Sequence, residues 1–175
     1  MLTKTISMTL DQKSLDEAIH EIELFEQDLK NALDGLCRVL MDEGVAHAKM
    51  ELTAFPAIDT GALMASIGHG MFDPSSGVGI IYAGAYYAAY VEYGTGVRGE
   101  ANPHPEPGTA GWKYNLKGYG KKGKQSGWYY QPVGGGGKWV WTSGMPARPF
   151  MYNTLRYLEE YAERKAGDII ATYAF

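Results

Sequence analysis

One long amphipathic stretch near the start of the chain limits what the protein can fold into. Its apolar residues recur at steps of three, four or seven positions, the spacing of one helical face; they are Leu15, Ile19, Ile22, Leu29, Leu33, Leu36 and Leu40. The pattern predicts a helix from about Ser14 to about Lys49, capped by Asp11 or Ser14 and about 50 Å long. The rest of the fold must be arranged along this helix.

The outer face of the expected helix is acidic. It carries Asp16, Glu17, Glu21, Glu23, Glu26 and Asp28. Two interpretations remain open: a solvated helix surface, or a docking face for a basic partner.

Shorter elements are expected before and after this helix. The alternation of apolar and polar residues over 4–10 predicts a first strand. Beyond the long helix, an Asp59 or Thr60 side-chain oxygen can cap a short helix that carries Leu63 and Ile67.

The next segments alternate between strand and helix patterns. Two strand-like runs, 67–72 and 77–82, flank a turn composition and predict a hairpin. Residues 85–93 then predict a short helix that Gly94 ends, because glycine is common just beyond a helix C-terminus.

Residues 98–143 have a different character, and no periodic helix is expected in them. Aromatic and β-branched runs at 127–133 and 138–142, separated by glycines, predict a second hairpin. A final amphipathic helix follows from Pro149, with Phe150 and Leu155 on its apolar face. The expected fold is α+β: a small antiparallel sheet packed with a long N-terminal and a C-terminal helix, plus a β-hairpin insertion, in a single domain over 1–175.

Composition sets the middle of the chain apart. Of the 23 glycines, 14 fall between Gly94 and Gly144, and the net charge is −9 over 1–97, +5 over 98–143 and zero over 144–175. The overall charge of −4 argues against a protein that coats nucleic acid, which needs many Lys and Arg. A single cysteine, Cys37, excludes an internal disulfide and the usual cysteine zinc sites. We expect neither a signal peptide nor a membrane span.

Known catalytic and cofactor-binding patterns are absent from the sequence. The four histidines, His20, His47, His69 and His104, have no metal-ligand spacing. The glycine run at 134–137 leads into a strand-like segment, whereas a phosphate-binding loop opens a helix. We therefore expect no enzyme activity, no cofactor, no metal and no small-molecule substrate.

The strongest candidate for recognition is the aromatic and lysine-rich part of the insertion. Its candidate contact residues are Lys121, Lys122, Lys124, Trp128, Tyr130, Trp139 and Trp141. Such a surface can stack nucleic-acid bases or sugars, but aromatic residues on strands can equally pack against the domain or a neighbouring subunit.

Three motifs, in order after the long helix, resemble those of the "gp ten-like" neck and tail-completion proteins of long-tailed bacteriophages. They are Asp59-Thr-Gly-Ala-Leu63-x-x-Ser66-Ile67, Tyr87-Ala-Ala-Tyr90-Val-Glu92-Tyr93-Gly94-Thr-Gly96 and Pro146-Ala-Arg148-Pro149-Phe150-Met151. The resemblance spans roughly 14–161, and the insertion resembles that of the longer variants of the family.

The resemblance implies fold-defining roles for the motif residues. These are Asp59, Thr60, Gly61, Leu63, Ser66, Tyr90, Glu92, Tyr93, Gly94, Pro146, Arg148, Pro149 and Phe150. In this interpretation the first motif starts the second helix, the second turns into the insertion, and the third enters the last helix, with Phe150 in the core.

The resemblance also implies a structural virion protein that joins head to tail or completes the head-proximal end of the tail, as a ring. Its partners would be copies of itself and neck, head-closure or tail-tube proteins, with possible contact to exiting DNA; it would be made in the host cytoplasm and located in the virion neck. Whether it is a neck protein or a tail terminator stays open.

The uneven charge suggests how copies could assemble. The acidic helix of one subunit could face the lysine-rich insertion of the next in a head-to-tail ring. The alternative function is a DNA- or glycan-binding module that acts through the same insertion.

Overall fold

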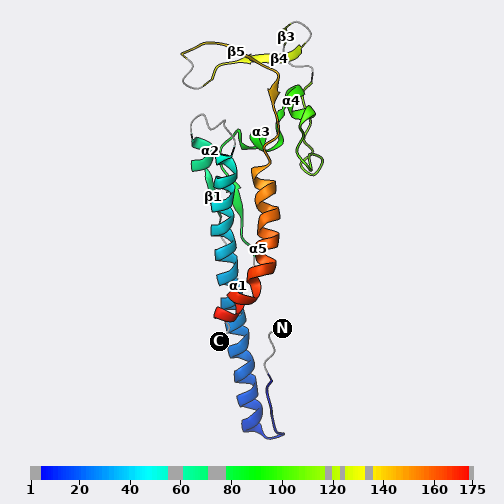
Figure 1. Cartoon of the computed structure of the whole chain (residues 1–175). Helices are drawn as coiled ribbons and strands as arrows, with labels where there is room; N and C mark the ends of the chain where they lie inside the picture. The colour runs from blue at the N-terminus through cyan, green and yellow to red at the C-terminus, as the bar shows by residue number, and fades with distance from the viewer. Residues whose placement is uncertain are drawn as a thin grey trace.

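The computed structural model describes residues 5–54, 61–70, 78–116, 120–122, 125–132 and 136–173. Two long antiparallel helices, α1 (Gln12–Thr53) and α5 (Phe150–Tyr173), form the shaft of an elongated molecule (Figure 1). The insertion lies at one end, and the first turns of α1 project beyond α5 at the other. The small strands are antiparallel, so the α+β prediction is confirmed.

α1 begins where the sequence indicates. Asp11 is extended, and its carboxylate accepts a hydrogen bond from the backbone N–H of Ser14 at 3.0 Å, which satisfies a free amide of the first turn. The helix ends at Thr53, four residues beyond the expected end. Small residues let α5 approach α1: a Cβ on Gly44 would overlap the Ile81 side chain and lie 2.9 Å from Leu158 Cδ1.

The expected first strand is wrong. Residues 5–9 are irregular, and they run back along the start of α1 (Figure 1). The backbone N–H of Thr9 donates to Ser14 Oγ at 2.9 Å, and Ala18 is buried. Alternation alone does not make a strand, because a strand also needs a neighbouring strand to pair with, and residues 5–9 pair with none of the described strands.

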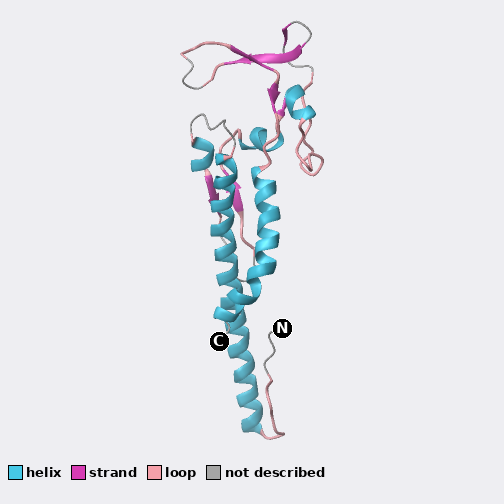
Figure 2. Cartoon of the chain, in the orientation of Figure 1, coloured by secondary structure: helices cyan, strands magenta, loops and turns pink. Residues whose placement is uncertain are grey.

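The first hairpin is confirmed, although its strands are shorter than expected. Strands β1 (Ile67–His69) and β2 (Ile81–Ala83) are antiparallel, with Ile67 opposite Ala83 (Figure 2). The preceding helix α2 (Ala62–Ala65) has Gly61 at its N-cap, with φ 67°, instead of the expected Asp59 or Thr60, which lie outside the described residues.

Two short helices precede the insertion. α3 (Ala88–Tyr93) ends at Gly94, with φ 75°, as predicted. α4 (Gly96–Ala101) corrects the expectation that no helix enters 98–143. It is too short to show a period in the sequence, and tertiary contact holds it, because a Cβ on Gly99 would lie 3.0 Å from the Tyr114 ring.

The insertion contains a three-stranded antiparallel sheet. Strands β4 (Gln125–Tyr130) and β5 (Val140–Thr142) form the predicted hairpin, with Tyr129 opposite Trp141. A further strand, β3 (Gly120–Lys122), pairs with β4 and was not predicted. The short strand β6 (Gly144–Met145) leads back to the shaft.

The core lies where α1, α2, α3 and the start of α5 meet. Its buried members are Ala48, Leu52, Leu63, Ile67, Ala88 and Phe150. Phe150 is the largest fully buried side chain among the described residues. Leu155, expected on the apolar face of α5, is instead 52% exposed, because this part of the helix borders an open groove described below.

Candidate functional site

A buried carboxylate joins the second and third motifs. Glu92, at the end of α3, is 6% exposed. Its Oε2 accepts from the backbone N–H of Met151 and its Oε1 from that of Tyr152, both at 2.9 Å. Because the first amides of a helix lack intrahelical partners and carry partial positive charge, Glu92 caps α5.

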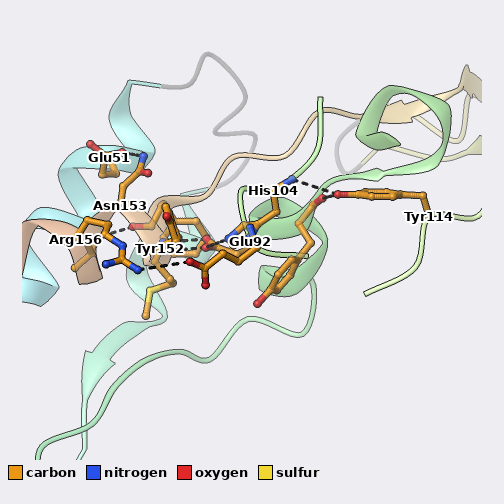
Figure 3. Close-up of polar contacts among 12 residues, drawn as sticks. Glu51, Glu92, His104, Tyr114, Tyr152, Asn153 and Arg156 are labelled. Atoms are coloured by element: carbon orange, nitrogen blue, oxygen red, sulfur yellow. Dashed lines mark hydrogen bonds and ion pairs between the residues drawn. The ribbon is translucent and has the colours of Figure 1, made fainter. Parts of the chain in front are cut away.

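His104 completes this carboxylate site. Its Nδ1 accepts from the backbone N–H of Glu106 at 2.9 Å, so its Nε2 carries the proton and donates to Glu92 Oε1 at 3.1 Å (Figure 3). His104 is 4% exposed. The carboxylate therefore has three donors, and every polar atom of the pair is engaged in holding the fold.

The two ends of the insertion are paired with each other. Thr95 pairs with Met145 and Gly96 with Gly144, and the backbone N–H of Arg148 donates to Val91 O at 2.9 Å. Glycine is required at these crossings, since Gly144 has φ 99° and a Cβ there would overlap the Thr95 carbonyl oxygen. The second and third motifs thus form one junction in space.

Aromatic side chains fold the first part of the insertion back onto α3. The Trp112 ring stacks on Tyr93 with centroids 5.2 Å apart, and its Nε1 donates to Gly94 O at 3.1 Å. The hydroxyl of Tyr114 donates to Tyr93 O at 3.0 Å (Figure 3). Trp112 and Tyr114 are therefore packing residues.

The structure divides the motif residues between two places. Gly61, Leu63 and Ser66 lie beside the core, where Ser66 Oγ accepts from the backbone N–H of Ala85 at 3.0 Å. The remaining described ones belong to the junction; they are Tyr90, Glu92, Tyr93, Gly94, Pro146, Arg148, Pro149 and Phe150. Burial beside Arg98 lowers the pKa of Arg148, which nonetheless stays protonated at neutral pH.

Of the candidate contact residues of the insertion whose side chains the structure describes, two are exposed and two are packed. Trp139 is 66% and Tyr130 43% exposed. Trp128 packs over Gly96, and Trp141 packs edge-on against Tyr129 with centroids 5.0 Å apart. The side chains of Lys121 and Lys122, and all of Lys124, lie outside the described residues.

Tyr129, another aromatic residue of the insertion, is 54% exposed. Sequence reasoning missed a groove of about 460 Å³ between β2, α3 and α5, lined among others by Tyr82, Met151 and Leu155. Glu92 and His104 reach its wall but are fully hydrogen-bonded to the fold.

Among the titratable side chains that line the groove is Tyr93. Burial next to Glu92 and Glu106 raises the pKa of Tyr93, so its phenol is neutral at neutral pH and is no general base. Within the described ranges, no three His, Cys, Asp or Glu side chains are grouped to hold a metal ion. No described helix is long and apolar enough to cross a membrane.

Neither a protein-family model, nor a curated protein, nor a solved structure matches this chain.

Proposed function

We propose that this protein is a structural component of a tailed-bacteriophage virion that joins head to tail or completes the head-proximal end of the tail, as a ring of copies. The observation that carries the proposal is exposed apolar surface at both ends of an elongated molecule (Figure 1). Side chains there are 37–66% exposed; they are Leu15, Ile19, Ile22, Leu29 and Leu33 at one end and Tyr129, Tyr130 and Trp139 at the other. Patches of this kind mark surfaces for assembly.

The motif junction supports the proposal in a different way. Glu92 of the second motif binds the backbone of Met151 in the third motif and that of Tyr152, and His104 of the insertion binds the same carboxylate. The buried polar groups of the junction hold α3, the insertion and α5 together. Such a fold suits a structural protein whose exposed contact surfaces can vary. The proposed partners are copies of the chain and head-closure or tail-tube proteins in the virion neck.

The elongated shape limits how copies are arranged in a ring. The acidic first half of α1 and the insertion lie at opposite ends (Figure 1). Upright neighbours in a ring would keep these two regions apart. Pairing of the acidic helix with the insertion of the next copy therefore requires neighbours that overlap end to end.

The proposal is tested by deleting the gene from its phage and imaging the particles by electron microscopy. We expect DNA-filled heads and separate tails, and joined virions once the intact protein is supplied from a plasmid. Joined, infectious virions without the protein would overturn the proposal. Lys165→Gln, at an exposed residue of α5 outside both apolar surfaces, serves as a matched complementation control.

The second candidate function is binding of DNA or a glycan through the insertion. Tyr130 and Trp139 are exposed near Lys138 on the hairpin, and exposed aromatics beside lysine can stack bases or sugars. An electrophoretic shift of DNA that Tyr130→Ser and Trp139→Ser together abolish would favour this candidate. A shift that survives both exchanges would place the DNA contact elsewhere.

A further inference from the structure

The first half of α1 carries an apolar stripe whose side chains all stay more than a third exposed. Its members are Leu15, Ile19, Ile22, Leu29 and Leu33, which are 43%, 47%, 55%, 37% and 41% exposed. The face of α1 that the rest of the chain buries here is a neighbouring one, with Ala18 and Ala32. The helix thus has two apolar faces, and only the face of small residues is used within the chain.

The spacing of the stripe specifies the shape of its occupant. The steps of four, three, seven and four residues are the a and d positions of a heptad repeat, which continues through the half-buried Leu36 and Leu40. A repeat of 3.5 residues keeps one stripe facing a second helix, whereas an extended partner would not follow it. The occupant is therefore a helix that lies along α1.

Charge makes the same stretch of a second copy a less favourable occupant than a basic helix, because both copies are acidic here. Glu26 takes an a position within the stripe, and Asp16 and Glu23 border it. Lys30, 2.8 Å from Glu26 Oε1, lowers the pKa of that carboxyl, so Glu26 is ionised at neutral pH. Parallel pairing would bring Glu26 against its own copy, and antiparallel pairing would lay two stretches of eight acidic and two basic side chains along each other, so like charges outnumber opposite charges in either case.

A basic helix avoids the repulsion between two acidic stretches. Residues 11–34 hold eight acidic side chains and two lysines. Lysines or arginines at the positions flanking the apolar seam of a partner would face Asp16, Glu23 and Glu26 and form the interhelical ion pairs that set partner choice in coiled coils.

We infer that the first half of α1 is a docking seam for a basic amphipathic helix of a different protein. The inference rests on the proposed function only in placing that protein in the virion neck. Apolar contacts along the stripe would supply the affinity, and the acidic border would reject helices with acidic flanks.

The test uses the full chain and two synthetic peptides of about four heptads each, both with Ile and Leu in the seam. One peptide has Lys at every flanking position and the other has Glu. By fluorescence anisotropy in about 50 mM salt, we expect the Lys peptide to bind at least about tenfold more tightly than the Glu peptide, and this preference to shrink in about 500 mM salt.

Variants of the chain separate the seam from other exposed apolar sites. Ile22→Asp with Leu29→Asp should abolish binding of the Lys peptide. Leu155→Asp, at a residue that is 52% exposed on α5, should leave it unchanged. Glu23→Lys with Glu26→Lys should reverse the preference, so that the Glu peptide binds more tightly.

Three results would overturn the inference. They are equal or absent binding of both peptides, binding that survives the double aspartate variant, and self-association of the unmodified chain at pH 7 that this variant abolishes. Circular dichroism confirms that each variant is folded. Joined virions after deletion of the gene would overturn the proposed function but would not change the peptide results. Failure of the proposed function and failure of the docking seam can therefore be told apart.

Discussion

The two ends of the shaft differ in how far contacts within the chain hold their side chains. At the insertion end, the carboxylate of Glu92 has three donors, and backbone pairs join the flanks of the insertion. At the other end, the first turns of α1 carry exposed Leu and Ile side chains beside acidic ones. The base of the insertion is thus fixed by contacts within the chain, whereas the first turns of α1 leave their Leu and Ile side chains exposed. If the proposed function is correct, stability depends on the first region, and assembly can use the second.

The largest effect is expected where the junction is tightest. Glu92→Ala leaves two backbone amides and the buried His104 Nε2 without an acceptor, which should lower the free energy of unfolding by about 3 kcal/mol or more. Urea denaturation measures the change. The exposed Glu159→Ala is the matched control. A loss no larger than that of the control would break the comparison between the two ends.

Two glycine variants test the same junction, with a smaller expected loss of stability. Gly144→Ala should cost about 2–3 kcal/mol, because a left-handed backbone and an overlap with Thr95 O both oppose a Cβ. Gly136→Ala, with φ 60° and no atom within 4 Å, should cost only about 1 kcal/mol. Thermal unfolding of the two variants compares them directly, and equal losses would show that Gly144 matters only for its backbone angle.

The middle of the shaft should respond to alkaline pH. Tyr157 donates to Glu43 Oε1 at 2.5 Å, and this hydrogen bond raises the pKa of the phenol. The stabilisation is fully present below the unfolded pKa of about 10 and is lost as pH rises through the folded value. Urea titrations at pH 8 and pH 11 measure how far the free energy of unfolding falls between these two pH values. We expect a smaller fall for Tyr157→Phe than for the unmodified chain. Tyr86→Phe, at a residue that is 92% exposed, should not change the loss.

The smallest effect is expected at the projecting end. Ile19→Ser should change the free energy of unfolding of the isolated chain by about 0.5 kcal/mol or less, since this side chain is already 47% exposed. Leu63→Ala in the core should cost about 2–4 kcal/mol in the same denaturation assay. A loss for Ile19→Ser close to the loss for Leu63→Ala would show that the apolar stripe is part of the core of the chain.

Local signals in the sequence predicted the elements that depend on neighbouring residues. Helix periodicity and the Asp11 cap predicted α1, and Gly94 predicted the end of α3. The glycine run at 134–137 predicted the turn of the β4–β5 hairpin. The motif positions were taken from a resemblance, which did not say what binds Glu92.

The missed features depend on contacts between distant residues. His104 lies 12 residues from Glu92, and Tyr152 lies 60 residues from it. No periodicity links them, so neither the carboxylate site nor the groove could be inferred. The strand over 4–10 failed for the same reason, because a strand needs an edge elsewhere in the fold.

The paired flanks of the insertion also have an evolutionary consequence. Thr95 with Met145 and Gly96 with Gly144 fix the gap that the intervening segment must close. The first part of that segment is constrained, because His104, Trp112 and Tyr114 bind the junction. Because the entropy of closing a loop grows only slowly with its length, the part beyond Tyr114 can accept many lengths at small cost. That part can therefore diverge, shorten or be exchanged between lineages while the helical shaft keeps its geometry.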